Sequence, residues 1–158
     1  MAERIVVNTG PLIALARMEA IDVAGQLPYE FLCPSEVRAE LEAGAAVGHP
    51  MVNPLWLHSQ SLQSPLSSLV LAALDAGEAA VIQLALEQQI SLVCIDEWKG
   101  RRVALAAGLR VTGTLGLLGR AKVLGIIPAV KPLIDRALRS GIHYHPELVR
   151  KVLDALGE

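Results

Sequence analysis

The sequence predicts a three-layer α/β fold, in which a mainly parallel central sheet carries helices on both faces. Short apolar runs alternate with helical segments along the chain, which is typical of a parallel sheet. One run, Leu92–Ile95, is continuously apolar, as expected of a strand buried on both faces. Hydrophobic residues make up 53% of the chain and aromatic residues only 3%, so aliphatic side chains must build the core. This scarcity of aromatic rings argues against a stacking-based single-strand binder, which uses aromatic platforms.

Apolar runs bounded by turn residues locate the strands. The first run ends at Asn8-Thr9-Gly10-Pro11, a turn in which Asn8 or Thr9 can cap the next helix. The segment 45–68 is rich in Pro, Gly, Ser and Gln, so we expect a loop with one short edge strand there. The expected strands are residues 5–7, 31–33, 55–57 at the edge, 92–95 and 110–112.

Helical periodicity and capping residues locate the helices. The strongest pattern begins at Glu78, with apolar residues repeating on one face, and Gly44 is expected to end an earlier helix. The expected helices are residues 12–17, 21–27, 35–43, 69–74, 78–88, 99–107, 114–124, 131–140 and 146–156. We therefore expect one domain over residues 1–158, with a core at about 5–124 and C-terminal helices within 131–156.

The composition gives no indication of a membrane or secreted protein. Prolines and polar residues interrupt the longest uncharged stretch, residues 43–74, and a spanning helix needs about 20 mostly apolar residues. The N-terminus does not resemble a secretory signal. Cys33 and Cys94 lie in apolar runs and are expected to be buried thiols. The cytoplasm is the expected compartment.

The net charge of −2 hides an uneven distribution along the chain. Residues 1–98 carry three arginines against twelve acidic residues, whereas residues 99–158 carry eleven lysines and arginines against four. Such a division suggests one part that binds cations and another that binds polyanions, although solvated helix faces would also explain it. Lys99, Arg101 and Arg102 begin a helix beside Asp96 and are the candidates for RNA phosphates, unless they are ordinary surface charges.

Polar residues follow the predicted strands at the edge where parallel sheets bind ligands. Asn8 ends the first strand and Asp96 ends the buried strand, while Glu40 and Glu78 lie on helices that can face the same edge. Carboxylates gathered this closely repel one another and normally require a cation. Oxygen ligands without neighbouring Cys or His favour Mg²⁺ or Mn²⁺ over zinc.

The order and spacing of these motifs resemble the PIN-domain nucleases. IVVNTGPL (5–12) is similar to their first motif, and Ala39-Glu40-Leu41 matches the second acid. GEAAVI (77–82) looks like the third motif, and Asp96 follows Glu78 by eighteen residues, like the fourth. The string beginning at Asp96, DEWKGRRVALAAGLRVTGTLGLL, is similar to a PIN-like subfamily of nucleic-acid-binding proteins. The resemblance covers about residues 5–124 and is weaker towards the C-terminus.

This resemblance implies a PIN-like fold and a Mg²⁺- or Mn²⁺-dependent endoribonuclease, a phosphodiester hydrolase. It assigns Asn8, Glu40, Glu78 and Asp96 to the metal site, directly or through water. Thr9 and Thr114 would complete the catalytic group by orienting water or phosphate. Many relatives are toxins of toxin–antitoxin pairs, so RNA, a small antitoxin protein and a second copy in a homodimer are the implied partners.

Two positions depart from the family pattern. The usual first acid is Asp, whereas Asn8 brings an amide oxygen without charge, and Glu78 replaces the commoner Asp. The alternative function is therefore a catalytically weakened PIN-fold module that binds nucleic acid or protein. A third class, a nucleotide-binding α/β protein, would need a phosphate-binding loop that the sequence lacks.

Simpler interpretations exist for several of these residues. Glu40 can be one solvated acid among others on its helix, and Glu78 can simply favour a helix N-terminus. The glycines from Gly113 to Gly119 have the spacing G-x-x-G-x-x-G, which suits helix packing rather than dinucleotide binding. The run 143–145, His-Tyr-His, has no third metal ligand at a suitable spacing, so helix capping and surface placement are expected.

Overall fold

The computed structural model describes residues 2–158 and contains a five-stranded sheet in the order β3-β2-β1-β4-β5. Every pair of neighbouring strands is parallel, so the predicted parallel sheet is confirmed. The strands are β1 (Glu3–Val7), β2 (Tyr29–Pro34), β3 (Leu57–Gln60), β4 (Leu92–Cys94) and β5 (Arg110–Thr112). The edge strand predicted at residues 55–57 exists, but it begins at Leu57. A turn closed by the hydrogen bond from the Leu57 N–H to the Pro54 carbonyl occupies the residues before it.

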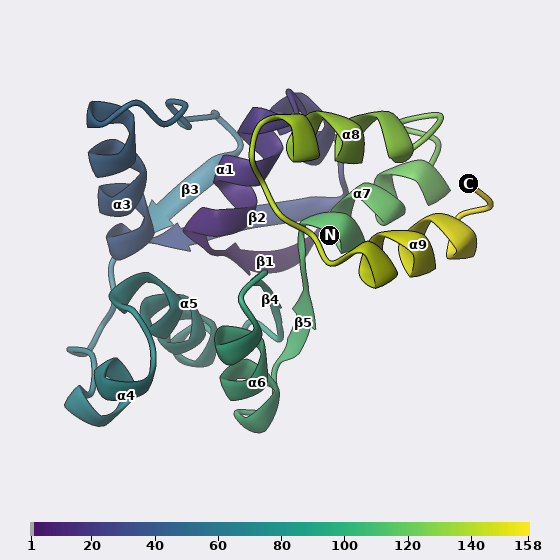
Figure 1. The fold of residues 1–158 in the computed structure, drawn as a ribbon. Coiled ribbons are helices and arrows are strands. Elements are labelled where there is room, and N and C mark those ends of the chain that lie inside the picture. Colours follow the sequence, from purple (N-terminus) through teal and green to yellow (C-terminus); the bar gives the residue numbers. More distant parts are fainter. Residues whose placement is uncertain (1) are drawn as a thin grey trace.

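Helices cover both faces of the sheet, as the three-layer prediction requires (Figure 1). Helices α1, α3, α7 and α8 lie on one side of the sheet, and α4, α5 and α6 lie on the other (Figure 1). The helices are α1 (Thr9–Arg17), α2 (Ile21–Gly25), α3 (Ser35–Ala46), α4 (Ser68–Ala73), α5 (Ala76–Glu87), α6 (Trp98–Ala106), α7 (Thr114–Val123), α8 (Lys131–Arg139) and α9 (Pro146–Ala155).

Two local predictions about helix ends are wrong. Helix α3 continues through Gly44 to Ala46, because Gly44 keeps ordinary helical backbone and the positive φ of 103° occurs only at Gly48. Asn8 occupies the N-cap position of α1, yet its side chain makes no capping hydrogen bond, and neither does that of Thr9. The capping role predicted for this turn is therefore absent, which leaves both side chains free for other contacts.

The central strand β1 is completely buried over its last three residues, Ile5, Val6 and Val7. Ile5 lies opposite Phe31 of β2 on one side and Leu92 of β4 on the other. Burial on both faces explains the unbroken aliphatic run in the sequence. The two cysteines, Cys33 and Cys94, are buried and unpaired, as predicted.

Backbone hydrogen bonds hold the carboxyl ends of three neighbouring strands level with one another. The Asn8 amide N–H donates to the Cys94 carbonyl at 3.0 Å, and the Ile95 N–H donates to the Thr112 carbonyl at 3.0 Å. The chain leaves β1 and β4 on opposite sides, so this edge is a topological switch point, where open α/β sheets bind ligands. Asn8 and Asp96 follow β1 and β4 at this edge.

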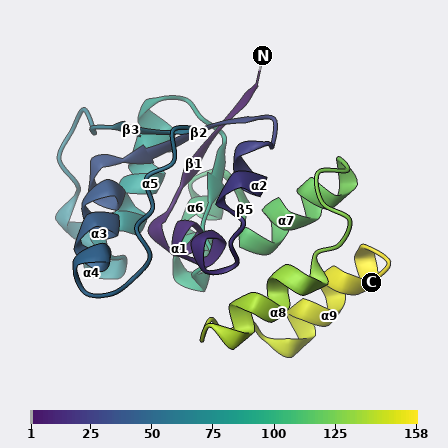
Figure 2. The same cartoon turned by 90° about the horizontal axis from the view of Figure 1, so that it is seen from above.

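Helices α8 and α9 lie side by side at one flank of the molecule, next to α7 (Figure 2). Lys122 of α7 donates to the Leu156 carbonyl at 2.6 Å and forms an ion pair with Glu158 at 2.9 Å. The Glu158 carboxylate also accepts from the backbone N–H groups of Val130 and Lys131 at the start of α8. Burial raises the pKa of Glu158, but these donors outweigh that effect and lower the pKa to about 2. The end of α9 is thus attached to both α7 and α8.

None of the helices formed by residues 2–158 combines the length and the apolar character that crossing a membrane requires.

Candidate metal and nucleic-acid site

Asn8 supplies a buried polar group with no partner. Its side chain is 6% exposed, and its Oδ1 makes no hydrogen bond to any residue that the structure describes. A buried amide oxygen without a donor costs about 1–3 kcal/mol, so its retention calls for a ligand. A bound cation or water would supply the missing partner.

Glu40 reaches the same edge from α3. The Thr9 hydroxyl donates to Glu40 Oε2 at 2.6 Å, a short bond of the kind that charged acceptors make. Gly77, in the first turn of α5, lies against this carboxylate: a Cβ at position 77 would stand 2.8 Å from Glu40 Cδ. The glycine therefore lets α5 approach α3 closely at the site.

Glu78 is buried at the N-terminus of α5, with 6% of its surface exposed. It forms a capping box with Asp75, whose Oδ1 accepts from the Glu78 N–H at 2.8 Å. Burial and the neighbouring charge of Asp75 raise the pKa of Glu78; the backbone hydrogen bond to Asp75 lowers it, and the charges of Glu97 and Glu40 raise it further. The cap explains why a Glu stands here, and the raised pKa shows that its charge is poorly compensated.

Asp96 is held by the residues that begin α7. One carboxylate oxygen accepts from the Thr114 N–H at 2.8 Å, and the other accepts from the Thr114 hydroxyl at 2.6 Å. Thr114 itself is fully buried. Gly113, just before Thr114, leaves room for the Asp96 carboxylate. A Cβ at position 113 would stand 2.7 Å from Asp96 Oδ1 and 2.9 Å from Arg101 Nη1.

The structure brings all six of the predicted metal-site and catalytic-group residues to one edge of the sheet. They are Asn8, Thr9, Glu40, Glu78, Asp96 and Thr114. Each acid has its own donors. Among residues 2–158, however, no three side chains of His, Cys, Asp or Glu lie close enough together to hold one metal ion. The acids are therefore separately held and do not form a closed cage.

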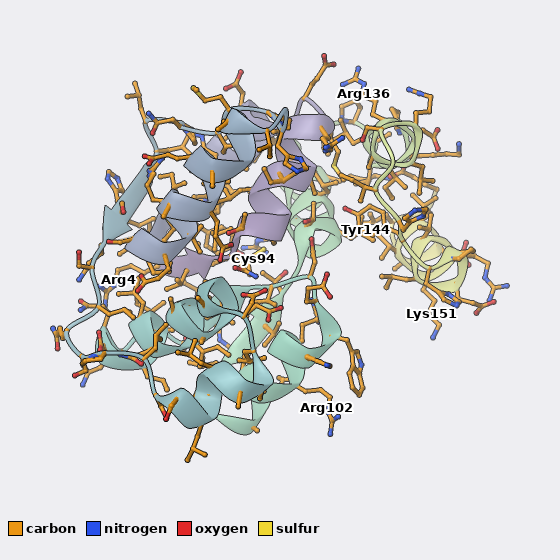
Figure 3. All side chains as sticks on the ribbon, turned by 60° about the vertical axis from the view of Figure 1, so that its left-hand side comes forward. Arg4, Cys94, Arg102, Arg136, Tyr144 and Lys151 are labelled. Atoms are coloured by element: carbon orange, nitrogen blue, oxygen red, sulfur yellow. The ribbon has the colours of Figure 1, made fainter. Side chains whose placement is uncertain are left out.

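The three basic residues predicted to bind phosphate do not form one patch. Arg101 lies beside Asp96 and donates to the Ile95 carbonyl at 2.8 Å. Lys99 and Arg102 line a separate hollow with Leu74, between α4 and α6. Arg102 lies at the outer surface of α6 (Figure 3), with its guanidinium 4.5 Å from the centroid of the Trp98 ring. Only Arg101 adjoins the acids.

Sequence reasoning missed three residues near the acids. Glu97 and Asp75 influence the pKa of Glu78, and the pair Asp96-Glu97 was a visible signal for the first of them. Tyr144 reaches Asp96 from the C-terminal segment, since the charge of Asp96 contributes to its raised pKa. No sequence pattern predicted that Tyr144 lies near Asp96, because 48 positions separate the two residues and only folding brings them together.

Comparison with known families gives one match. The model of a family described as a PIN domain (DUF3368) matches residues 4–158, nearly the whole chain, so the chain belongs to the PIN-domain family. The match extends beyond the residues that carry the resemblance and includes α8 and α9. No curated protein and no solved structure matches the chain.

The packing at Gly113 yields a first prediction. Gly113→Ala should destabilise the protein by about 1–3 kcal/mol, because Thr114 holds both oxygens of Asp96 and prevents the carboxylate from yielding. Gly10→Ala, in α1, is the matched control: nothing lies within 4 Å of the added methyl group, so stability should stay equal or rise slightly. Thermal melts of both variants measure the difference. Equal stability of Gly113→Ala and wild type would contradict the close approach.

The charge on Glu78 yields a second prediction, tested without metal. Because the folded-state pKa is raised, ionised Glu78 destabilises the fold once the pH exceeds its unfolded value near 4.5. Glu78→Gln should therefore be the more stable protein at pH 7, and its advantage should shrink as the pH falls to 4. Divalent metal should favour wild type. Melts from pH 4 to 8 in EDTA and in Mn²⁺ measure both effects.

Glu87, at the end of the same helix, is the control with the opposite sign. Hydrogen bonds, foremost from the Gln63 N–H, lower the pKa of Glu87, so Glu87→Gln should lose stability at neutral pH and recover it relative to wild type in acid. If the two variants respond to pH in the same direction, the electrostatic account of Glu78 is wrong.

Proposed function

We propose that this PIN-domain protein is a metal-dependent endoribonuclease. The observation that carries the proposal is the presence of four oxygen donors, from Asn8, Glu40, Glu78 and Asp96, along the carboxyl edge of a parallel sheet. Family membership suggests nuclease chemistry for such a site, and Arg101 beside it offers a positive charge to a phosphate.

The residues present suit Mg²⁺ or Mn²⁺. The donors are oxygen atoms only, which these hard cations prefer. The unpartnered Asn8 Oδ1 and the raised pKa of Glu78 both mark places where a cation would relieve an unfavourable state. Because the carboxylates are separated, we propose that water molecules complete the coordination, as is usual for Mg²⁺.

When bound, such a cation lowers the pKa of a water molecule and stabilises charge on the scissile phosphate. The protein's own residues prepare the site for this. Thr9 and Thr114 fix the orientation of Glu40 and Asp96 by short hydrogen bonds, so little reorganisation is needed during the reaction. Arg101 attracts the substrate phosphate to the edge of the sheet.

The resemblance motivates finer proposals about the biological setting. The protein would act in the cytoplasm as the toxin of a toxin–antitoxin pair, as a homodimer, restrained by a small antitoxin protein. The second candidate function, a binding module with weakened catalysis, draws on Asn8, since an amide in place of a carboxylate removes one charge from the metal site.

Asp96 offers the direct test of the proposed activity. Asp96→Asn should reduce metal-dependent RNA cleavage by about two to three orders of magnitude. Two unit charges about 4 Å apart interact by about 4 kcal/mol at an effective dielectric constant of about 20, and the amide forfeits that attraction. Cleavage of mixed RNA in Mn²⁺ is the measurement, with the exposed Asp22→Asn as control. Wild-type activity in Asp96→Asn would remove Asp96 from the site.

Asn8→Asp tests the departure from the family pattern. The two side chains have nearly the same shape, so the fold should accept the change. In EDTA the extra charge beside Glu40 and Glu78 should lower the melting temperature. In Mn²⁺ it becomes a ligand, so the metal-induced rise in melting temperature and the cleavage rate should both increase.

The only other asparagine in the chain, exposed Asn53, provides the control. Asn53→Asp lies beside Arg38, away from the acids, and should leave the response to Mn²⁺ unchanged. If Asn8→Asp behaves like this control in both assays, Asn8 is not part of the metal site.

A further inference from the structure

A pocket of about 580 Å³ opens beside Asp96, between the body of the protein and the C-terminal segment. Its walls come from α6, the start of α7 and the residues that lead into α9. The side chains of interest combine flat rings, a guanidinium and two carboxylates: Asp96, Glu97, Trp98, Arg101, His143, Tyr144 and His145. Asp96 lines this pocket and is also a residue of the candidate metal site, so the pocket is continuous with that site.

We propose that this pocket holds the base and ribose of the nucleotide adjacent to the scissile phosphate in single-stranded RNA. The inference rests on the proposed ribonuclease function and names the part of the substrate that this pocket binds. Single-stranded RNA is typically bound by stacking its bases on aromatic, His or Arg planes, and this pocket contains all three. Its volume lies within the range of ordinary small-ligand sites.

The distribution of aromatic residues supports this assignment. The chain has five, and three of them, Tyr29, Phe31 and Trp56, contact one another around β2. The other two, Trp98 and Tyr144, both line the pocket. Trp98 is 67% exposed, which core packing does not require. The scarcity of aromatic residues therefore does not exclude stacking, because two of the five stand beside the site.

Tyr144 adds a polar group that is available to a ligand. It lies between the C-terminal helices and the body (Figure 3), and its buried hydroxyl makes no hydrogen bond within residues 2–158. The hydroxyl is therefore available to donate to a ribose or base oxygen.

The charge at the pocket is mixed, with Arg101 beside the carboxylates of Asp96 and Glu97, so a phosphate has Arg101 as its cationic partner there. Arg101 lines the pocket, and Arg102, which lines the separate hollow between α4 and α6, holds its guanidinium 4.5 Å from the centroid of the Trp98 ring. A strand whose phosphate lies at the acids would pass these cations as it enters the pocket.

Binding to short RNA tests the inference independently of cleavage. The probes are fluorescein-labelled oligouridylate and oligoadenylate of about ten nucleotides, and fluorescence anisotropy in EDTA and in Mn²⁺ gives Kd. Trp98→Ala should weaken binding by about fivefold to a hundredfold, the usual cost of losing one stacked base. His143→Ala and Tyr144→Phe should each weaken it severalfold. Thermal melts establish that each variant is folded.

Two variants serve as matched controls. Leu105→Ala removes another exposed hydrophobic side chain from α6, and Lys151→Ala removes a positive charge from the outer side of α9 (Figure 3); neither residue lines the pocket. Both should bind RNA like wild type. If Leu105→Ala loses as much RNA affinity as Trp98→Ala, the loss reflects nonspecific damage to α6, and the assignment is overturned.

The possible failures are distinguishable. If wild type cleaves RNA but the folded pocket variants bind both probes unchanged, the pocket inference is wrong and the ribonuclease proposal survives. If the pocket variants lose binding while wild type never cleaves with Mg²⁺ or Mn²⁺, the inference stands and the ribonuclease proposal fails. If wild type binds neither probe, the pocket does not serve RNA, and a protein segment becomes its candidate occupant.

Discussion

The parallel pairing of β1 between β2 and β4 is the constraint on which the rest of the structure depends. The chain moves from β1 to β2 on one side through α1 and α2, and it reaches β4 on the other side only after β3, α4 and α5. The carboxyl end of β1 is therefore the switch point. The hydrogen bond from the Asn8 N–H to the Cys94 carbonyl ties that end to β4. Because β1 is buried on both faces, only small shifts are possible there, and the oxygen atoms around it are held in place.

Around this strand, each acid is held by a different local device. Glu40 uses a threonine hydroxyl, Glu78 uses a capping box, and Asp96 uses both the N–H and the hydroxyl of Thr114. Glycines at positions 77 and 113 let helices and carboxylates approach without a Cβ between them. Burial first, and then the charges of Asp75, Glu97 and Glu40, raise the pKa of Glu78. In the proposed metal site, these local hydrogen bonds would hold the carboxylates in place before a cation binds, as electrostatic preorganisation requires.

The C-terminal segment adds tyrosine and histidine side chains beside the sheet edge. Lys122 and Glu158 attach α9 to α7 and α8, and the run before α9 then places Tyr144 beside Asp96. His145, whose ring accepts from the Glu147 N–H, caps α9 as the sequence suggested, yet it also faces the pocket. Residues 143–145 thus end a loop, lead into α9 and form one wall of the pocket next to the candidate site.

The sequence by itself predicted the α/β class, the parallel sheet and the strand-end positions of Asn8 and Asp96 at its edge, and it placed Glu40 and Glu78 on helices able to face that edge. Apolar runs and strand-end polar residues are local patterns, and parallel strands necessarily bring their carboxyl ends together. Tertiary structure alone decided which hydroxyl holds which acid, that Arg101 faces the site while Lys99 and Arg102 do not, and that Tyr144 lies beside Asp96. These contacts join residues far apart in the chain, and they depend on helix rotation and side-chain direction, which packing sets and local propensity does not encode.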